Sequence, residues 1–437
     1  MLIFILDIIL AFNLYLAIRF FKSIVSPPFL MGAGMLLASI ISSFFYQEWS
    51  MMNFSFHSVV LLGGGSVFFT LCCILFRHRN NHLRLGLGTV DFNKWNLQLI
   101  FKILLVLDIL YIFHILGIYY QMRDQFRITV LSDLIFARRL DFNAEDSDFE
   151  LSGISIQISF FYHLLTLVSA WIFALIMSSK MYQKNNIKKI IFPIIILFFL
   201  AIIEGVLSGA KGNVLSVLFS IIFYMIIMHY SYSCSFATPK WLKKFIIVFG
   251  ILGSYFFVSL SSILGRSLDS YNSGFEGLAV YCGAEIKNFD ILINKNISNS
   301  GNFGAHVFSN IYSKLHIENN INFNYHEHQS INNHILGNVN TQFADLYVDF
   351  GTVGTFICIG LIAFIIMFIY NRSILQMVWP MTYNIYGILY CLIAYYVFNW
   401  FFAGMLSAQL FSPFLLKYGL GAYVLRLLFN KIVAKRY

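Results

Sequence analysis

The sequence predicts an all-α polytopic membrane protein, and three observations lead to this fold class. Hydrophobic residues make up 59% of the 437-residue chain, charged residues only 11%, and the mean hydropathy is +0.75, whereas about a quarter of a soluble domain is charged. Apolar runs of roughly 18 to 23 residues, long enough to cross about 30 Å of hydrocarbon, recur along the chain. Basic residues concentrate in every second connection between these runs.

About eleven predicted spans follow one another along the chain. The first six lie near Leu2–Phe20, Phe29–Tyr46, Phe56–Phe76, Leu97–Tyr119, Ile154–Met177 and Ile187–Leu207. The other five lie near Val214–Tyr230, Phe245–Ile263, Val353–Tyr370, Tyr383–Phe402 and Gly404–Leu425. The first span lacks the features of a cleaved signal peptide, so we expect it to be retained as a helix. No Pro- or Gly-rich linker divides the chain, which predicts a single integral membrane domain over residues 1–437.

Lysine and arginine set the expected orientation, because loops rich in them stay on the cytoplasmic side of a membrane. The basic connections contain Arg19 and Lys22; Arg77, Arg79, Arg84 and Lys94; Lys180, Lys184, Lys188 and Lys189; Lys240, Lys243 and Lys244; Arg372; and Arg426, Lys431, Lys435 and Arg436. This alternation places the N-terminus outside and the C-terminus inside. The net charge of +9 then reflects topology and contact with anionic membrane lipid, and not nucleic-acid binding.

Three outward loops follow from this orientation, at residues 121–153, 208–213 and 265–350. The third lies between the eighth and ninth spans and is too long to lack secondary structure. We expect it to contain amphipathic helices on the outer leaflet, for example around Leu278–Ile293, where apolar residues recur at helical spacing. Glu318–Asn333 has the composition of turns and polar loop.

Positively charged side chains in these loops are candidates for phosphate binding. Arg138 and Arg139 lie in the first loop, and guanidinium groups bind phosphate oxygens in pairs. Lys211 lies beside the helix start in a Gly-rich link, an arrangement that suits an anion. Arg266 stands at the entry of the third loop. The alternative for the first loop is a solvated surface whose arginines pair with the acidic residues of 145–150.

The end of the long loop carries the groups that point most clearly to catalysis. Asp345 and Asp349 lead straight into an apolar span, where a carboxylate is costly unless it has a partner or a task. His334 is a further candidate, because an imidazole takes a proton from a sugar hydroxyl near neutral pH. These three residues are therefore candidates for chemistry at the membrane surface. Asp349 has an alternative structural role as a cap of the following span.

Other residues of the long loop have the chemistry of sugar binding. Tyr281 and Tyr347 carry rings that stack on sugars or, alternatively, pack in the core or at the membrane interface. Asn338 and Thr341 add polar side chains to the same region. We predict that these four residues contact a glycan.

Patterns typical of metal or nucleotide sites are weak in this chain. Asp-x-Asp at 146–148 is too short to be specific, and His-Glu-His at 326–328 lies in a segment with the composition of a flexible loop. No glycine-rich phosphate loop is followed by the expected Lys and Ser/Thr. We therefore expect neither a metal ion nor a cofactor.

Three segments resemble the bacterial O-antigen polymerase family, also called oligosaccharide repeat-unit polymerases. They are LSGAKGN at 207–213, YCGAEIKNFD at 281–290 and GNVNTQFADLYVDFGTVG at 337–354. The third is the most specific, and the family pattern is matched by Gly337, Asn338, Thr341, Tyr347, Asp349, Phe350, Gly351 and Gly354. Family members often carry Ser-Arg where this chain has Ala210-Lys211, which keeps the positive charge but loses the bidentate fork.

The resemblance implies a GT-C-like helical core with an outward loop over the active site. The reaction would be glycosyl transfer on the periplasmic face of the bacterial inner membrane, moving a growing glycan from undecaprenyl diphosphate onto a new lipid-linked repeat unit. The cations that would stabilise the diphosphate are Arg138, Arg139, Lys211 and Arg266. The base for the acceptor hydroxyl would be His334, Asp345 or Asp349. A chain-length regulator is a candidate protein partner. The alternatives are an O-antigen ligase and a flippase or transporter of lipid-linked glycans, the latter favoured by Asp108 within the fourth span.

Overall fold

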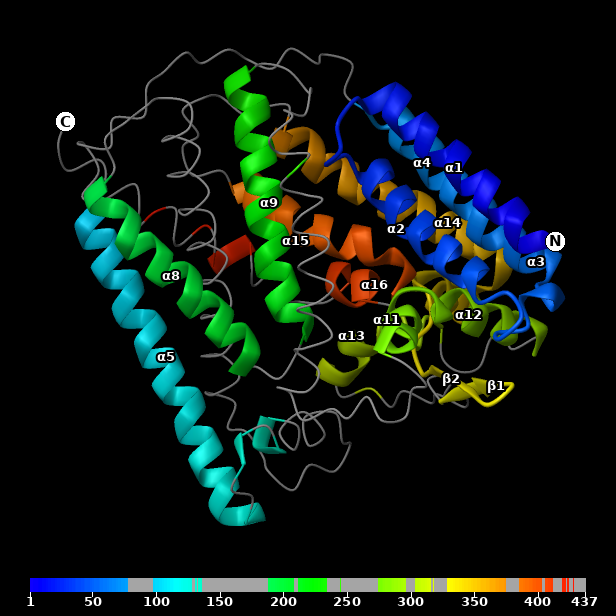
Figure 1. Ribbon diagram of the computed structural model, residues 1–437. Helices are drawn as coiled ribbons and strands as arrows, with labels where there is room; N and C mark the ends of the chain where they lie inside the picture. The colour runs from blue at the N-terminus through cyan, green and yellow to red at the C-terminus, as the bar shows by residue number, and fades with distance from the viewer. Residues whose placement is uncertain are drawn as a thin grey trace. The chain divides into compact units, whose positions relative to one another are not determined.

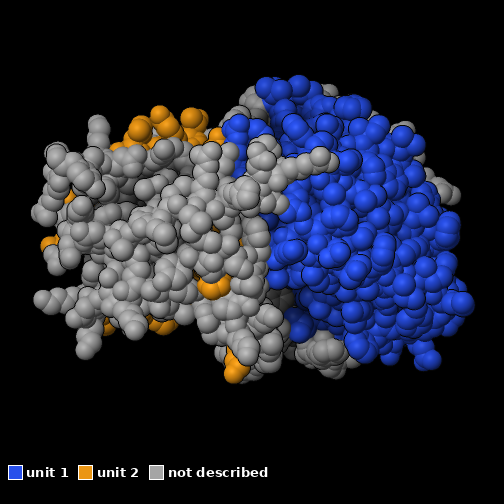
Figure 2. Space-filling model, turned by 90° about the horizontal axis from the view of Figure 1, so that it is seen from above, with its two compact units in different colours: residues 1–82, 269–376, 392–417 blue, residues 83–268, 377–391, 418–437 orange. Residues whose placement is uncertain are grey.

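The computed structural model describes residues 1–77, 97–127, 188–207, 211–233, 274–295, 303–315, 328–374, 385–402 and 405–411, with a few isolated residues between them. This part of the chain is mostly helical, in agreement with the predicted fold class (Figure 1). The chain divides into two compact units, coloured in Figure 2. Unit 1 comprises residues 1–82, 269–376 and 392–417, and unit 2 comprises residues 83–268, 377–391 and 418–437.

Among the described residues, five helices are long and apolar enough to cross a membrane. They cover Leu2–Phe21, Pro27–Phe44, Phe56–Leu75, Lys102–Gln125 and Gln342–Ser373. Shorter apolar helical stretches lie at Ile195–Leu207, Val214–Ile227 and Leu389–Phe401, within other predicted spans. The predicted spans at Ile154–Met177 and Phe245–Ile263 and half of the residues of Gly404–Leu425 lie outside the described residues. A helical membrane protein is therefore what both the sequence and the structure support.

Unit 1 is built on a bundle of long helices, seen on the right of Figure 1. Its members are α1 (Leu2–Phe21), α2 (Pro27–Phe44), the continuous run of α3 (Phe56–Val59), η2 (Val60–Gly64) and α4 (Gly65–Leu75), and α14 (Gln342–Ile374). α1 packs against α2 and α4, and α14 packs against α4. Two prolines open α2, at positions where a helix has no use for the missing N–H.

Helix α1 is apolar on both of its faces. The face toward the bundle is formed by Ile3, Leu6, Leu10 and Ala17. The opposite face is exposed and carries Phe4, Ile8, Phe12, Tyr15 and Ile18. A helix with apolar side chains all around suits a membrane span, since water would disfavour the second face.

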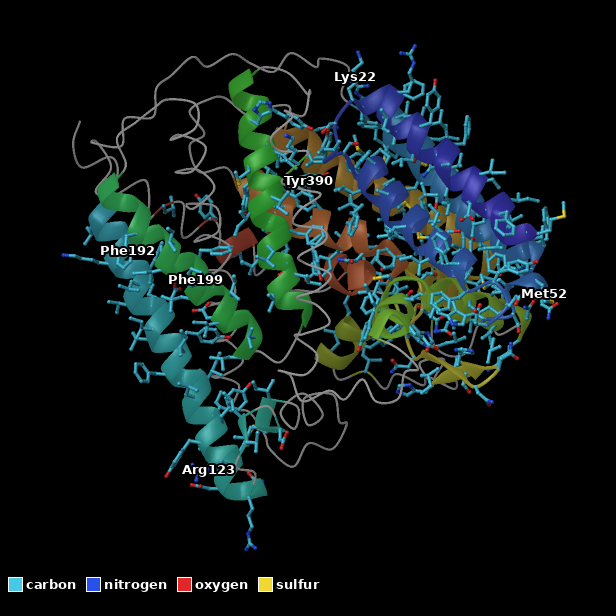
Figure 3. All side chains as sticks on the ribbon, in the orientation of Figure 1. Lys22, Met52, Arg123, Phe192, Phe199 and Tyr390 are labelled. Atoms are coloured by element: carbon cyan, nitrogen blue, oxygen red, sulfur yellow. The ribbon has the colours of Figure 1, made fainter. Side chains whose placement is uncertain are left out.

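Unit 2 contains the first part of α15 (Ile385–Phe398) and three longer described helices, α5 (Leu97–Phe126), α8 (Lys188–Leu207) and α9 (Lys211–Ser233). α8 packs against both of the others. The buried cluster of this unit draws on α5 through Tyr111, Ile115 and Met122, which recur at helical spacing. In Figure 3 the labelled side chains of Phe192 and Phe199 project from α8, and Phe192 is 72% exposed.

Short elements cover the end of unit 1 at which α2 ends and α3 and α14 begin (Figure 1). They are η1 (Met51–Asn53), α11 (Gly274–Cys282), α12 (Ala284–Asn294), α13 (Ser309–Lys314), β1 (Gln329–Ile331) and β2 (His334–Gly337). The two strands form an antiparallel hairpin that pairs Ile331 with His334. Asn332 and Asn333 make its turn, both with positive φ, as a two-residue hairpin turn requires. The prediction of loop alone over Glu318–Asn333 thus missed strand β1.

The predicted helix around Leu278–Ile293 is present as two helices that break at Gly283. A Cβ at Gly283 would lie 2.8 Å from Ile41 Cγ2, so glycine permits close packing on α2. The Ser42 hydroxyl also donates a hydrogen bond of 2.6 Å to the Gly283 carbonyl. Nearly all of α12 is buried, including its charged residues. The expectation of an amphipathic surface helix is therefore wrong for α12, whose Lys287 and Asp290 are buried as an ion pair.

Helix α14 begins at Gln342 and so includes the last part of the predicted 265–350 loop. It kinks at Gly351, whose φ of 65° and ψ of −171° are accessible essentially to glycine alone. Asp345, Tyr347 and Asp349 therefore lie on a helical segment before the kink, and not on an irregular loop.

Candidate functional site

The two ends of unit 1 differ in chemistry. Arg19 lies in the last turn of α1 and Arg372 in the last turn of α14. Arg77, just after α4, donates a hydrogen bond to the Phe20 carbonyl, which brings the ends of α1 and α4 together. The opposite end, called the second end below, holds the short elements with their buried carboxylates and histidines. Figure 3 shows this separation through Lys22 and Met52, which mark the two ends of the bundle.

His334 and Glu276 form a histidine–carboxylate pair at the second end. His334 Nδ1 lies 2.6 Å from Glu276 Oε1. The Glu276 side chain is buried, but 24% of the His334 side chain is exposed. A carboxylate bound to Nδ1 favours the tautomer with a proton there, which leaves Nε2 as a proton acceptor. The pair therefore combines an oriented imidazole with access from outside.

A second histidine–carboxylate pair, His306 with Asp349, is closed to solvent. The two side chains are 7% and 2% exposed, with His306 Nδ1 2.7 Å from Asp349 Oδ1. Both carboxylate oxygens also accept from the His306 backbone N–H, and Oδ2 accepts from Val307 N–H at 2.8 Å. Asp349 thus holds the 304–308 turn onto α14. The suggestion that it caps the following span is wrong, because its amide partners belong to another segment.

Asp290 connects α12 with the start of α3. Its Oδ1 accepts from the Ser55 backbone N–H at 2.8 Å and from the Ser58 hydroxyl at 2.9 Å. Its Oδ2 pairs with Lys287 at 3.0 Å, and the same ammonium donates to the Ser50 carbonyl at 3.2 Å. Because both members of this ion pair are buried, they fix how α12 packs against the start of α3.

Two buried amides hold the chain on either side of the family-like 337–354 segment. Asn288 donates to the carbonyls of Leu336 at 3.2 Å and Val339 at 2.8 Å. Gln342 accepts from the backbone N–H groups of Leu406 and Ser407, which satisfies free donors at the start of α16 (Met405–Leu410). Side-chain hydrogen bonds therefore hold the β2–α14 connection in a defined conformation.

The residues predicted to contact a glycan have different environments. Asn338 is exposed, whereas Thr341 and Tyr347 are buried. Tyr281 is half-buried, with its ring centroid 6.3 Å from that of Phe402. His57 packs edge-on against Tyr347 and lies 3.0 Å from the Thr352 hydroxyl. Asn338 is therefore the member of this set best placed to meet a ligand from outside.

Glu285 is a buried carboxyl in the first turn of α12. Neither of its oxygens has a hydrogen-bond partner from another described residue. Burial raises the pKa of Glu285 well above its usual range, and a hydrogen bond from its own backbone N–H opposes this shift. The nearest cation along the helix, Lys287, is engaged by Asp290. Burial without a partner thus disfavours the charged form of Glu285.

The predicted diphosphate site falls largely outside the described residues. This holds for Arg138, Arg139 and Arg266, and for the side chain of Lys211. The backbone of Lys211 begins α9, as expected for a residue beside a helix start. Asp345 is buried on α14. Within the described part of the chain, no three His, Cys, Asp or Glu side chains gather in a metal-binding group.

Sequence reasoning missed Glu276 and His306, the partners of two predicted residues. Each lies far along the chain from its partner, and neither stands in a recognisable motif. The available signal for Glu276 was its place in a short apolar helix, since a carboxylate there needs a partner.

No protein-family model matches the chain, and no curated protein or solved structure matches it.

Proposed function

We propose that this chain is an inner-membrane O-antigen polymerase, with His334 as the base that activates the acceptor sugar. The proposal includes a GT-C-like core with about eleven spans, a periplasmic N-terminus and a cytoplasmic C-terminus. The single observation that carries it is the partly exposed His334 bound to a buried Glu276. The pair lies at the end of unit 1 opposite the basic helix ends, which is the outward end by the positive-inside rule.

Among the three predicted bases, the contacts favour His334. Asp349 already accepts hydrogen bonds at both oxygens and is 2% exposed, so a substrate hydroxyl has no route to it. Asp345 is buried on α14. His334 keeps one nitrogen for substrate while the other is held by a carboxylate, the arrangement that general-base catalysis uses.

The proposed reaction transfers a glycan between two lipid-linked molecules. His334 Nε2 takes the proton of the acceptor hydroxyl as that oxygen bonds to the anomeric carbon of the donor. The bond from this carbon to the undecaprenyl diphosphate oxygen breaks, and the diphosphate leaves with the electron pair. Arg138, Arg139, Lys211 and Arg266 remain the proposed groups for its charge, and a chain-length regulator remains a candidate partner.

One observation favours the second candidate, transport of lipid-linked glycans without chemistry. Asp108 lies within the α5 span and is 1% exposed, and neither of its oxygens has a hydrogen-bond partner among the described residues. A buried carboxyl inside a membrane span is costly and often serves translocation. An O-antigen ligase would share topology and donor with the polymerase and differ in its acceptor.

The lipopolysaccharide ladder of the host separates these functions. Deletion of the gene should reduce the ladder to core plus a single repeat unit for a polymerase, whereas loss of all capped core would indicate a ligase or flippase. An unchanged ladder would contradict all three proposals.

Site variants then test His334. Complementation with His334→Asn, which retains a donor toward Glu276, should lower polymerisation by about 10²–10⁴-fold at normal protein level. His328→Asn, at an exposed position on the same segment, is the matched control and should restore the full ladder. A full ladder with His334→Asn would remove His334 from the mechanism.

A further inference from the structure

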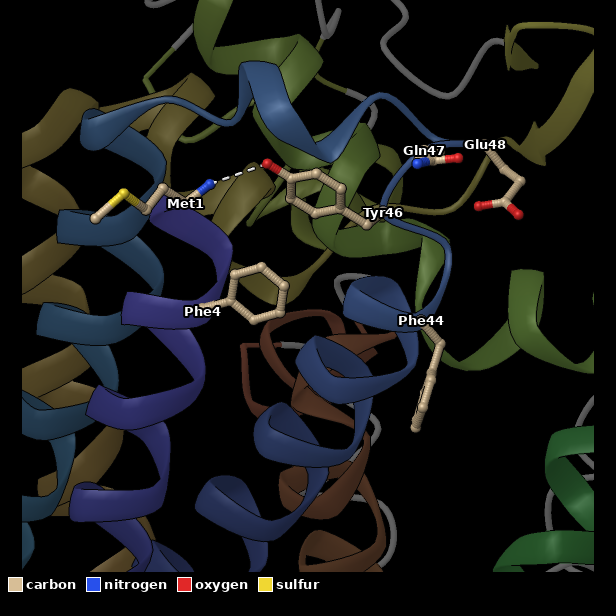
Figure 4. Close-up of a pocket in the computed structure, with 6 residues that line it drawn as sticks. All are labelled: Met1, Phe4, Phe44, Tyr46, Gln47 and Glu48. Carbon is tan, nitrogen blue, oxygen red and sulfur yellow. Dashed lines mark hydrogen bonds between the residues drawn. The ribbon is translucent and has the colours of Figure 1, made fainter.

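A surface hollow of about 570 Å³ lies at the second end of unit 1 (Figure 4). It is lined by Met1, Phe4, Phe44, Tyr46, Gln47 and Glu48. Three of these side chains are aromatic rings, and two carry an amide and a carboxylate. Pockets that combine apolar walls with a few polar groups are typical binding sites.

The aromatic walls of the hollow have a defined arrangement. The rings of Phe4 and Tyr46 stack with centroids 5.5 Å apart and an interplanar angle of 23°. Figure 4 shows these two rings facing each other, with Gln47 and Glu48 farther along the loop. The Phe44 side chain is 77% exposed at the end of α2. Such flat apolar surfaces suit the C–H face of a sugar ring.

The loop that carries Gln47 and Glu48 is held in one conformation. Asn332 donates to the carbonyls of Gln47 at 3.4 Å and Glu48 at 3.2 Å and to the Ser50 hydroxyl at 2.9 Å. Ser50 itself has a φ of 49°, a left-handed conformation that Lys287 supports through the Ser50 carbonyl. The buried ring of Trp49 stacks on Phe45 at 4.5 Å. The hollow is therefore formed before any ligand arrives.

The same hairpin connects the hollow to the proposed base. Asn332 is in the β1–β2 turn, and His334 is the first residue of β2. Their Cα atoms are therefore at most about 7.6 Å apart, two trans peptide steps. Asn332 contacts the rim of the hollow, while His334 contacts Glu276. If one sugar of a glycan occupied the hollow, the next sugar of the same glycan would lie near the hairpin.

We propose that this hollow binds a sugar ring of the lipid-linked glycan, adjacent to the sugar that reacts at His334. The assignment of a sugar as substrate rests on the proposed function. The polar side chains of the lining support it, since the Gln47 amide and the Glu48 carboxylate can bind the hydroxyl groups of a sugar. The polar rim likewise disfavours a purely hydrocarbon ligand, because Gln47 and Glu48 would lose water without gaining partners.

Binding by the purified protein in lipid nanodiscs tests this site. The probe is the polysaccharide released by mild acid from the host's lipopolysaccharide, followed by isothermal titration. We expect Phe44→Ala and Glu48→Gln each to weaken binding roughly tenfold, equivalent to about 1.4 kcal/mol. Phe12→Ala is the matched control, an exposed phenylalanine on α1 outside the hollow, and should bind as the wild type does. Equal affinities for all four proteins, or no binding by the wild type, would overturn the proposal.

Two further arms distinguish this site from the proposed activity and from lipid binding. His334→Asn should bind the polysaccharide normally even though it does not polymerise. If His334→Asn polymerises while Phe44→Ala still loses binding, the catalytic proposal fails and the sugar site stands. Short-chain, water-soluble phosphatidylglycerol should not compete with the polysaccharide. Competition that Phe44→Ala abolishes would show that the hollow binds a lipid and would overturn the sugar assignment.

Discussion

Replacing Asp290 by alanine is the strongest test of how the short elements are held at the second end of unit 1. One carboxylate oxygen joins α12 to Ser55 and Ser58 at the start of α3, and the other binds Lys287. Asp290→Ala removes all of these contacts at once. It also leaves the Lys287 ammonium, whose side chain is only 5% exposed, without its counter-charge.

The structure sets the size of the expected effect. Breaking a buried ion pair by removing one partner costs about 3–5 kcal/mol, and the partly buried Ser55 N–H, left without its acceptor, adds at most about 1–3 kcal/mol. The Ser50 carbonyl still accepts from Lys287, which reduces the loss. We therefore expect the free energy of unfolding to fall by about 4 kcal/mol. For a unit of this size, the midpoint of thermal unfolding then falls by roughly 8–16 °C.

Thermal unfolding of the detergent-solubilised protein, followed by intrinsic fluorescence, measures this effect. Ser58→Ala removes one hydrogen bond and should cost about 1 kcal/mol. Lys287→Met combined with Asp290→Ala removes the orphaned charge and should recover about 2 kcal/mol relative to Asp290→Ala alone. A midpoint for Asp290→Ala within 2 °C of the wild type, at the ~2–4 °C per kcal/mol expected here, would refute the reasoning. The reasoning would also be refuted if the loss of stability in the double variant equalled the sum of the losses in Lys287→Met and Asp290→Ala.

Two more predictions concern a buried acid and a strained glycine. Glu285→Gln removes a group whose folded-state pKa is raised, so the wild type should lose more stability than the variant as pH rises above about 4.5. Midpoints at pH 5 and pH 8 test this, and equal pH slopes would mean that the pKa of Glu285 is not raised. Gly351→Ala should cost about 1–3 kcal/mol because of its φ of 65°. Gly360→Ala in the same helix meets only ordinary contacts and is its control, and the prediction is wrong if the two variants have the same midpoint.

The sequence identified the polar segments of unit 1 better than it predicted their secondary structure and burial. It singled out His334, Asp345 and Asp349 near the start of a span, and the structure places them on β2 and on the first part of α14. It missed that α12 is buried, because hydropathy treats Lys287 and Asp290 as solvated charges. Only their mutual pairing, at 3.0 Å, makes burial tolerable.

The sequence by itself determined that this is a helical membrane protein, because the free energy of placing an apolar side chain in hydrocarbon is a property of each residue and adds along a span. Only the tertiary structure decided which carboxylate meets which histidine. Glu276 lies 58 positions from His334, and His306 lies 43 positions from Asp349. Such pairs form where packed helices bring the chain together, and nothing in the local residue pattern records that meeting.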